Sequence, residues 1–127
     1  PEWVLGLDHI HARPQLNKNL LKLLFSLPEK RRPDALAVLN ENFMPLVVEA
    51  LLELGQEPGR DVLLAAHCNY PSNAQRYPNT EYFTFPAEDV LQKAISLLKH
   101  PDGAMVSLIE PKSLTQLLKQ KNSTKES

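Results

Sequence analysis

The amino-acid sequence predicts an α+β fold, a single helix-dominated domain with a small sheet of three or four short strands. Leucine occurs 23 times and outnumbers the 7 valines and 3 isoleucines together by more than two to one. Leucine is the better helix former, whereas β-branched residues favour sheets. The 11 prolines are too many for helix interiors, so they separate the elements. An all-α domain is the alternative that the leucine excess leaves open.

The amino-terminal segment Trp3–His11 fits a strand or a helix, because its apolar residues satisfy a period of 2 and a period of 3.6. Gly6 and the shortness of the apolar run favour a strand. Pro14 begins a clear helix, which Pro28 ends. One side of this helix is apolar and wide, as expected of a helix that faces a core. Its residues are Leu16, Leu20, Leu23, Leu24 and Leu27.

A second helical region is predicted between Pro33 and Gly55. Proline is tolerated in a first helical turn, and the Asp34 carboxylate can accept hydrogen bonds from free amides there. Pro45 either kinks this helix or begins another, and Gly55 is a suitable left-handed terminator. Apolar residues recur at helical spacing through the region at Leu36, Leu39, Phe43, Leu46, Val47, Ala50, Leu51 and Leu54.

The middle of the chain contains two short apolar segments separated by a loop. Asp61–His67 is continuous and apolar, so it is either a buried strand or a buried helical run. Cys68–Thr80 has no periodicity and is predicted to be a loop. Glu81–Phe85 alternates in polarity and ends at Pro86, which is typical of a short strand.

A helix is predicted after Pro86, because Glu88 and Asp89 supply the negative charge that suits a helix amino terminus. Apolar residues then recur at helical spacing as far as Leu98. Ala104–Ile109 is predicted to be a further strand.

The last predicted element is a helix that begins near Ser113. Ser113 with Gln116 resembles a capping box, and the apolar residues of the helix end at Leu118. Residues 119–127 contain no apolar side chain to bury, so we expect a disordered polar tail. The predicted globular domain is therefore residues 1–118.

Composition excludes several classes of function. The 14 Lys and Arg against 15 Asp and Glu give a net charge of -1, which argues against a protein devoted to phosphate backbones. The four glycines never occur in a nucleotide-binding spacing, and no apolar run approaches the roughly 20 residues that cross a bilayer. We therefore expect no nucleotide loop and no membrane partner. The single cysteine, Cys68, forms no intrachain disulfide, so we expect a reducing, cytoplasmic setting.

Four residues carry an alternative, enzymatic hypothesis. On a strand, His9 and His11 point the same way, and together with His67 and Cys68 they could bind zinc. Cys68 could instead be a nucleophile that is activated by a histidine. If the strands are parallel, His67 and Cys68 lie near their carboxyl ends, where open α/β sheets bind ligands. A metal- or cysteine-dependent hydrolase-type enzyme is thus the first alternative, but we favour a small buried thiol at Cys68 and predict no catalytic site and no cofactor.

The preferred hypothesis is a small non-enzymatic regulatory or adaptor protein that acts by binding another protein. Aromatic side chains with polar tips, together with arginine, are typical of interface hot spots, although the same tyrosines could instead pin the loop to the core. A basic corner adjoins two predicted helices, with Lys18 and Lys22 nearby in the sequence. A nucleic-acid-binding regulator that uses this corner is the second alternative. The predicted binding residues are Tyr70, Arg76 and Tyr77 in the loop, Tyr82 in the short strand that follows it, and Lys30, Arg31 and Arg32 in the corner.

Overall fold

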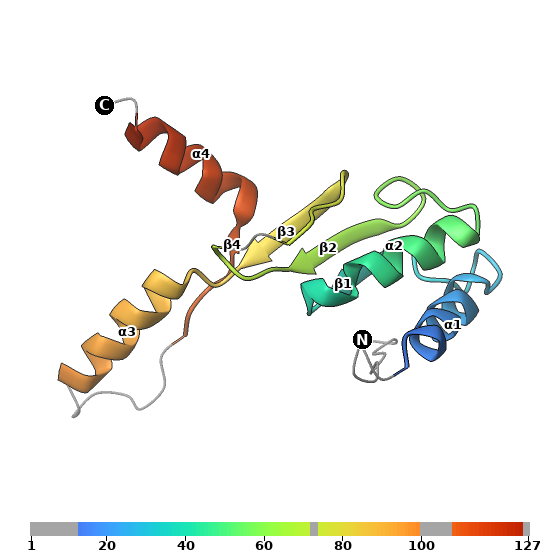
Figure 1. The fold of residues 1–127 in the computed structure, drawn as a ribbon, viewed down its shortest axis with the longest axis horizontal. Coiled ribbons are helices and arrows are strands. Elements are labelled where there is room, and N and C mark those ends of the chain that lie inside the picture. The colour runs from blue at the N-terminus through green and yellow to red at the C-terminus, as the bar shows by residue number, and fades with distance from the viewer. Residues whose placement is uncertain (1–12, 72–73, 100–107, 126–127) are drawn as a thin grey trace.

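The computed structural model describes residues 13–71, 74–99 and 108–125. These residues form four α-helices and one four-stranded mixed sheet (Figure 1), which confirms the predicted α+β fold. The elements follow in the order α1 (Pro14–Phe25), β1 (Ala35–Val38), η1 (a 3-10 turn, Glu41–Phe43), α2 (Met44–Glu53), β2 (Leu63–His67), β3 (Thr80–Thr84), α3 (Ala87–Lys99), β4 (Lys112–Ser113) and α4 (Leu114–Lys125).

The sheet has the strand order β1-β2-β3-β4. The first three strands are parallel, with Ala35 opposite Leu63 and Ala66 opposite Tyr82. The short β4 is antiparallel and pairs Ser113 with Phe83. The carboxyl ends of β1, β2 and β3 therefore lie at the same edge of the sheet.

The core lies between one face of the sheet and the pair of helices α1 and α2. The side of α1 that faces the core consists of Asn17, Leu21 and Phe25, which follow one another at four-residue spacing and are buried. The predicted apolar side is therefore wrong, because Leu16 and Leu23, two of its members, are 44% and 67% exposed. On β2, Leu64 and Ala66 are buried in the same cluster as Val47 and Leu51 of α2. The period of 2 in a strand thus places alternate residues of β2 in the core.

The prediction of a helix from Pro33 through Leu36, Leu39 and Phe43 is wrong, because β1 occupies Ala35–Val38 and pairs with β2. After β1, the Asn40 side chain accepts a hydrogen bond from the Asn42 amide at 3.0 Å and begins η1. Pro45 begins a new helix rather than kinking an existing one. It lies in the first turn of α2, where its missing amide hydrogen costs little.

Other predicted elements are confirmed. Pro14 begins α1, Glu81–Phe85 overlaps β3, and α3 follows Pro86. Of the two structures that Asp61–His67 allowed, the strand is observed, as β2. The last helix, α4, begins at Leu114 as predicted and continues to Lys125, seven residues beyond the predicted end of the domain.

Two predicted segments are placed only in part or not at all. Trp3–His11 lies outside the described residues, as do residues 104–107 of the predicted strand Ala104–Ile109. Leu108 and Ile109 have no regular secondary structure.

Candidate interaction surface

The predicted tyrosine loop is held to the core by its own tyrosines. Tyr82 is buried, and its hydroxyl oxygen accepts a hydrogen bond from the Tyr77 backbone amide at 2.9 Å. Tyr70 and Tyr77 are half-buried against the core cluster, and burial raises the pKa of Tyr77. Arg76 is exposed. The structure therefore brings Tyr77 and Tyr82 together in a contact within the chain and leaves Arg76 at the surface.

A polar contact that the sequence analysis did not identify joins the carboxyl ends of β1 and β2. The Glu41 carboxylate accepts hydrogen bonds from the backbone amide and the side-chain Nδ2 of Asn69, both at 3.2 Å. Glu41 begins η1 after β1, and Asn69 lies two residues beyond the end of β2. The sequence analysis could not identify this contact, because it did not establish that β1 and β2 are parallel strands. The parallel pairing places Glu41 and Asn69 at the same edge of the sheet.

The basic corner of Lys30, Arg31 and Arg32 lies in a turn between α1 and β1. The amides of Arg31 and Arg32 donate to the Pro28 carbonyl oxygen at 2.7 and 3.0 Å, which closes the turn. Lys30 and Arg31 are exposed, and Arg32 is half-buried.

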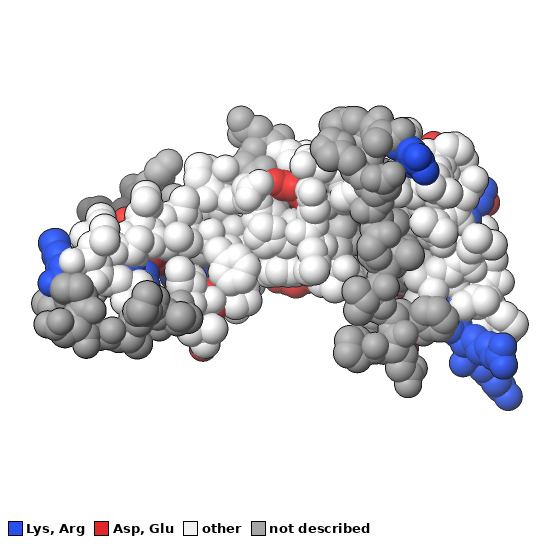
Figure 2. Space-filling model, turned by 90° about the horizontal axis from the view of Figure 1, so that it is seen from below, with Lys and Arg blue, Asp and Glu red and all other residues white. Residues whose placement is uncertain are grey.

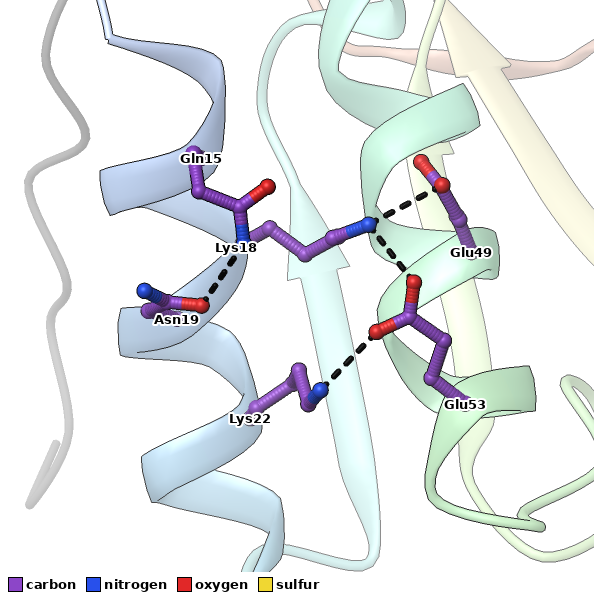
Figure 3. A network of polar contacts seen from close by, with 6 residues as sticks. All are labelled: Gln15, Lys18, Asn19, Lys22, Glu49 and Glu53. Atoms are coloured by element: carbon purple, nitrogen blue, oxygen red, sulfur yellow. Dashed lines mark hydrogen bonds and ion pairs between the residues drawn. The ribbon is translucent and has the colours of Figure 1, made fainter.

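Lys18 and Lys22 do not extend this corner, because both bind carboxylates of α2 (Figure 3). Lys18 Nζ lies 2.9 Å from Glu49 and 2.6 Å from Glu53, and Lys22 Nζ lies 2.8 Å from Glu53. Figure 2 shows basic side chains at the two ends of the molecule with a largely uncharged surface between them. On this face the described residues form no continuous basic stripe.

The residues of the enzymatic hypothesis are only partly placed. His9 and His11 lie outside the described residues. The His67 ring contacts the rings of Phe83 and Phe85, at centroid distances of 5.6 and 5.7 Å. Among the described residues no group of three or more His, Cys, Asp and Glu side chains is arranged to hold a metal ion.

Cys68 is a buried free thiol on the core side of the sheet. Desolvation, and secondarily the negative charge of Glu41, raise the pKa of the thiol. An activated cysteine nucleophile has a lowered pKa, so this environment favours the structural role predicted for Cys68.

One face of the sheet is left uncovered by the described helices. On β2 the residues that alternate with the buried Leu64 and Ala66 are Leu63, which is 62% exposed, and the half-buried Ala65 and His67. The adjoining strands continue the same face with small and aromatic side chains and one carboxylate, that of Glu81. We name this surface the outer face of the sheet, and it comprises Ala35, Ala37, Leu63, Ala65, His67, Glu81, Phe83 and Phe85.

The helix α3 is a second uncovered apolar surface. None of its residues is buried, and it extends away from the sheet in Figure 1. Leu91, Ile95 and Leu98 follow one another at spacings of four and three residues, so they form one stripe along the helix. All three are at least half-exposed, and Leu98 is 80% exposed.

Contacts at its first turn fix the direction of α3. Pro86 is buried, and its carbonyl oxygen accepts a hydrogen bond from the Val90 amide at 3.2 Å. The Asp89 carboxylate lies 2.5 Å from Lys112 Nζ of β4. The beginning of α3 is therefore tied to the sheet through β4, while none of the described residues of the helix is buried.

Comparison with known proteins gives this chain no relative. No family model, curated protein or solved structure matches it. None of the described helices is both long and apolar enough to cross a membrane. The evidence for function is therefore the outer face of the sheet and the apolar stripe of α3.

Proposed function

We propose that this chain is a regulatory or adaptor protein that acts by binding another protein. The outer face of the sheet is the observation that carries the proposal. Sheets of parallel strands are covered by helices on both faces in almost all proteins, whereas β1, β2 and β3 are covered by α1 and α2 on one face. A contiguous exposed apolar surface of this kind marks an interaction site.

The chemistry of the outer face suits a helix of the partner. Ala35, Ala37 and Ala65 are small, so a helix can approach the strands closely, and Leu63 with Phe85 offers larger apolar contacts at the margins. Aromatic groups of this type are enriched in protein interfaces. The only charged side chain among the named residues is Glu81, whose carboxylate accepts a hydrogen bond from Ser113 Oγ at 2.7 Å.

The predicted loop contact becomes secondary in this proposal. Tyr77 and Tyr82 contribute to the attachment of the loop, whereas Tyr70 and Arg76 remain candidates for an additional contact with the partner. We also propose a cytoplasmic location, which the single free thiol of Cys68 supports.

The proposal is tested with a pair of matched substitutions. Leu63 on the outer face is 62% exposed, and Leu52 on α2 is 58% exposed, so Leu63→Glu and Leu52→Glu place the same charge at equally accessible sites. Each variant is immobilised as bait, bound proteins are identified, and their affinities are measured. We expect Leu63→Glu to lose the partner and Leu52→Glu to retain it. A partner that binds both variants equally would contradict the proposal.

A further inference from the structure

We infer that the partner of the outer face is a second copy of this chain, whose α3 lies on the outer face while its own outer face receives α3 of the first copy. This inference rests on the proposed function, because it names the occupant of the proposed binding surface.

The stripe of α3 matches the outer face in chemistry and in length. The helix has 13 residues and is about 20 Å long, while the five-residue strands β2 and β3 are about 17 Å long. A helix of this length is marginal in water on its own. The stripe of Leu91, Ile95 and Leu98 would supply the cover that the parallel strands lack.

The first turn of α3 directs the helix away from its own sheet. The buried Pro86 and the ion pair between Asp89 and Lys112 hold the start of the helix beside β4. Figure 1 shows the helix continuing outward from that point. While these contacts persist, α3 can reach the outer face of a second copy but not its own.

Charge complementarity supports the same arrangement. Glu81 is the only charged group among the residues that define the outer face. By helical spacing, Lys99 borders the apolar stripe of α3, whereas Lys93 lies on the opposite side of the helix. Glu88 lies on the same side of the stripe as Lys99, and its carboxylate accepts a hydrogen bond from Gln92 at 3.3 Å. A docked α3 can therefore place a lysine near Glu81 without burying an uncompensated positive charge.

Reciprocal exchange gives a closed pair. If each copy donates one α3 and receives one, the two contacts are identical and related by a twofold axis, as in most homodimers. The exchange forms the helix–sheet contact twice, so it buries twice the area of a single docked helix.

The experiment measures the mass of the full chain in solution by sedimentation across micromolar concentrations. We expect the unmodified chain to be dimeric. Leu98→Glu in α3 and Leu63→Glu on the outer face should each raise the dimer dissociation constant at least about 100-fold, because each buries an unpaired charge. Leu52→Glu should leave the dimer intact. Thermal unfolding of each variant as a monomer verifies that the core is unchanged.

Mixing two variants tests the exchange itself. In a mixed pair of Leu98→Glu with Leu63→Glu, the unmodified α3 of one copy meets the unmodified outer face of the other. We therefore expect heterodimers at concentrations where each variant alone is monomeric. Two results would overturn the inference. If Leu63→Glu alone remained dimeric, the two copies would be paired through their α3 helices. If Leu98→Glu alone remained dimeric, they would be paired through their sheets.

The outcomes also separate this inference from the proposed function. A monomeric unmodified chain would overturn the exchange. If that monomer still bound another protein in a way that required Leu63, the proposed function would stand with a different partner. If it bound none, both would be overturned.

Discussion

Gly55 and Gly59 both have positive φ angles, +68° and +79°, but a side chain at each would meet different surroundings. A Cβ atom at Gly59 would overlap the carbonyl oxygen and the Cβ atom of Asn79, whereas nothing lies within 4 Å of one at Gly55. Both positions require the left-handed conformation that glycine adopts without strain. Gly59 is also the point where the segment before β2 contacts the residue that precedes β3.

We predict that Gly59→Ala lowers the free energy of unfolding by about 3 kcal/mol or more, since the overlap adds to the left-handed penalty. Gly55→Ala should lower it by about 1 kcal/mol from the backbone penalty alone. Urea unfolding of both variants measures the two losses. Equal losses would contradict the close approach of Gly59 to Asn79.

Thr84 at the end of β3 is fully buried, and its hydroxyl has no hydrogen-bond partner among the described residues. Leaving a polar group buried without a partner costs free energy, whereas an apolar group of the same shape does not. We therefore predict that Thr84→Val raises the free energy of unfolding by about 1 kcal/mol.

The matched variant for this prediction is Thr84→Ser, which keeps the hydroxyl and removes the methyl group. It should lower the free energy of unfolding by about 1 kcal/mol, in the range of other buried methyl deletions. Chemical unfolding of both variants decides the matter. A loss of stability in Thr84→Val would show that the hydroxyl is satisfied in solution.

At the scale of the elements, an ion-pair network at the edge of the core joins α1 to α2 (Figure 3). Hydrogen bonds from Lys18, and then from Lys22, lower the pKa of Glu53 from 4.5 to about 2. The same pairing with Glu53 and Glu49 raises the pKa of Lys18. The carboxylate of Glu53 thus binds protons less readily in the folded chain than in the unfolded chain.

This difference gives the stability a defined pH dependence. The stabilisation from ionised Glu53 is fully present above pH 4.5 and is lost as the pH falls toward 2, because the unfolded chain takes up the proton first. We predict that the melting temperature of Glu53→Gln falls less steeply than that of the unmodified chain as the pH is lowered from 4.5 to 2. Glu29→Gln, at an exposed carboxylate for which the described residues show no ion pair, should keep the slope of the unmodified chain. If the melting temperatures of Glu53→Gln and the unmodified chain fell equally steeply with pH, the ion-pair network would not contribute to stability.

The elements differ in how far local sequence determines them. The helices α1 and α3 were predicted because their apolar residues recur at 3.6-residue spacing over 12 and 13 residues. The strand β1 was not predicted, because three of its four residues, Ala35, Leu36 and Ala37, are good helix formers and Leu36 continues the helical spacing toward Phe43. Its strand conformation depends on pairing with β2, a contact 28 residues away in the chain.

The candidate surface was less predictable than the elements. The sequence shows that Tyr82 and Thr84 lie on one face of the strand and Phe83 and Phe85 on the other. It does not show which of these two faces is turned toward the core. That choice depends on which side of the sheet α1 and α2 cover. Likewise, the spacing in α3 identifies its apolar side but does not show whether another element covers it. The tyrosines therefore suggested a binding loop, whereas the exposed apolar residues lie elsewhere.

At the scale of the whole molecule, the helices are distributed unevenly around the sheet. In Figure 1, α1 and α2 lie together beside the sheet, while α3 and α4 extend from the end of the molecule where β4 pairs with β3. The apolar core is consequently concentrated on one side. In the proposed exchange, the second copy supplies the missing layer.

The exchange makes stability depend on concentration, which gives a prediction for the whole molecule. Association stabilises the folded chain by mass action but not the unfolded chain, so the melting temperature should rise with protein concentration. For a chain of this length, we expect a rise of about 2 °C for each tenfold increase in concentration. Differential scanning calorimetry over two decades of concentration measures the slope. Leu98→Glu should melt independently of concentration, since its α3 no longer binds the second copy, and Leu52→Glu should keep the slope of the unmodified chain. A melting temperature of the unmodified chain that does not change with concentration would mean that the folded chain is a monomer.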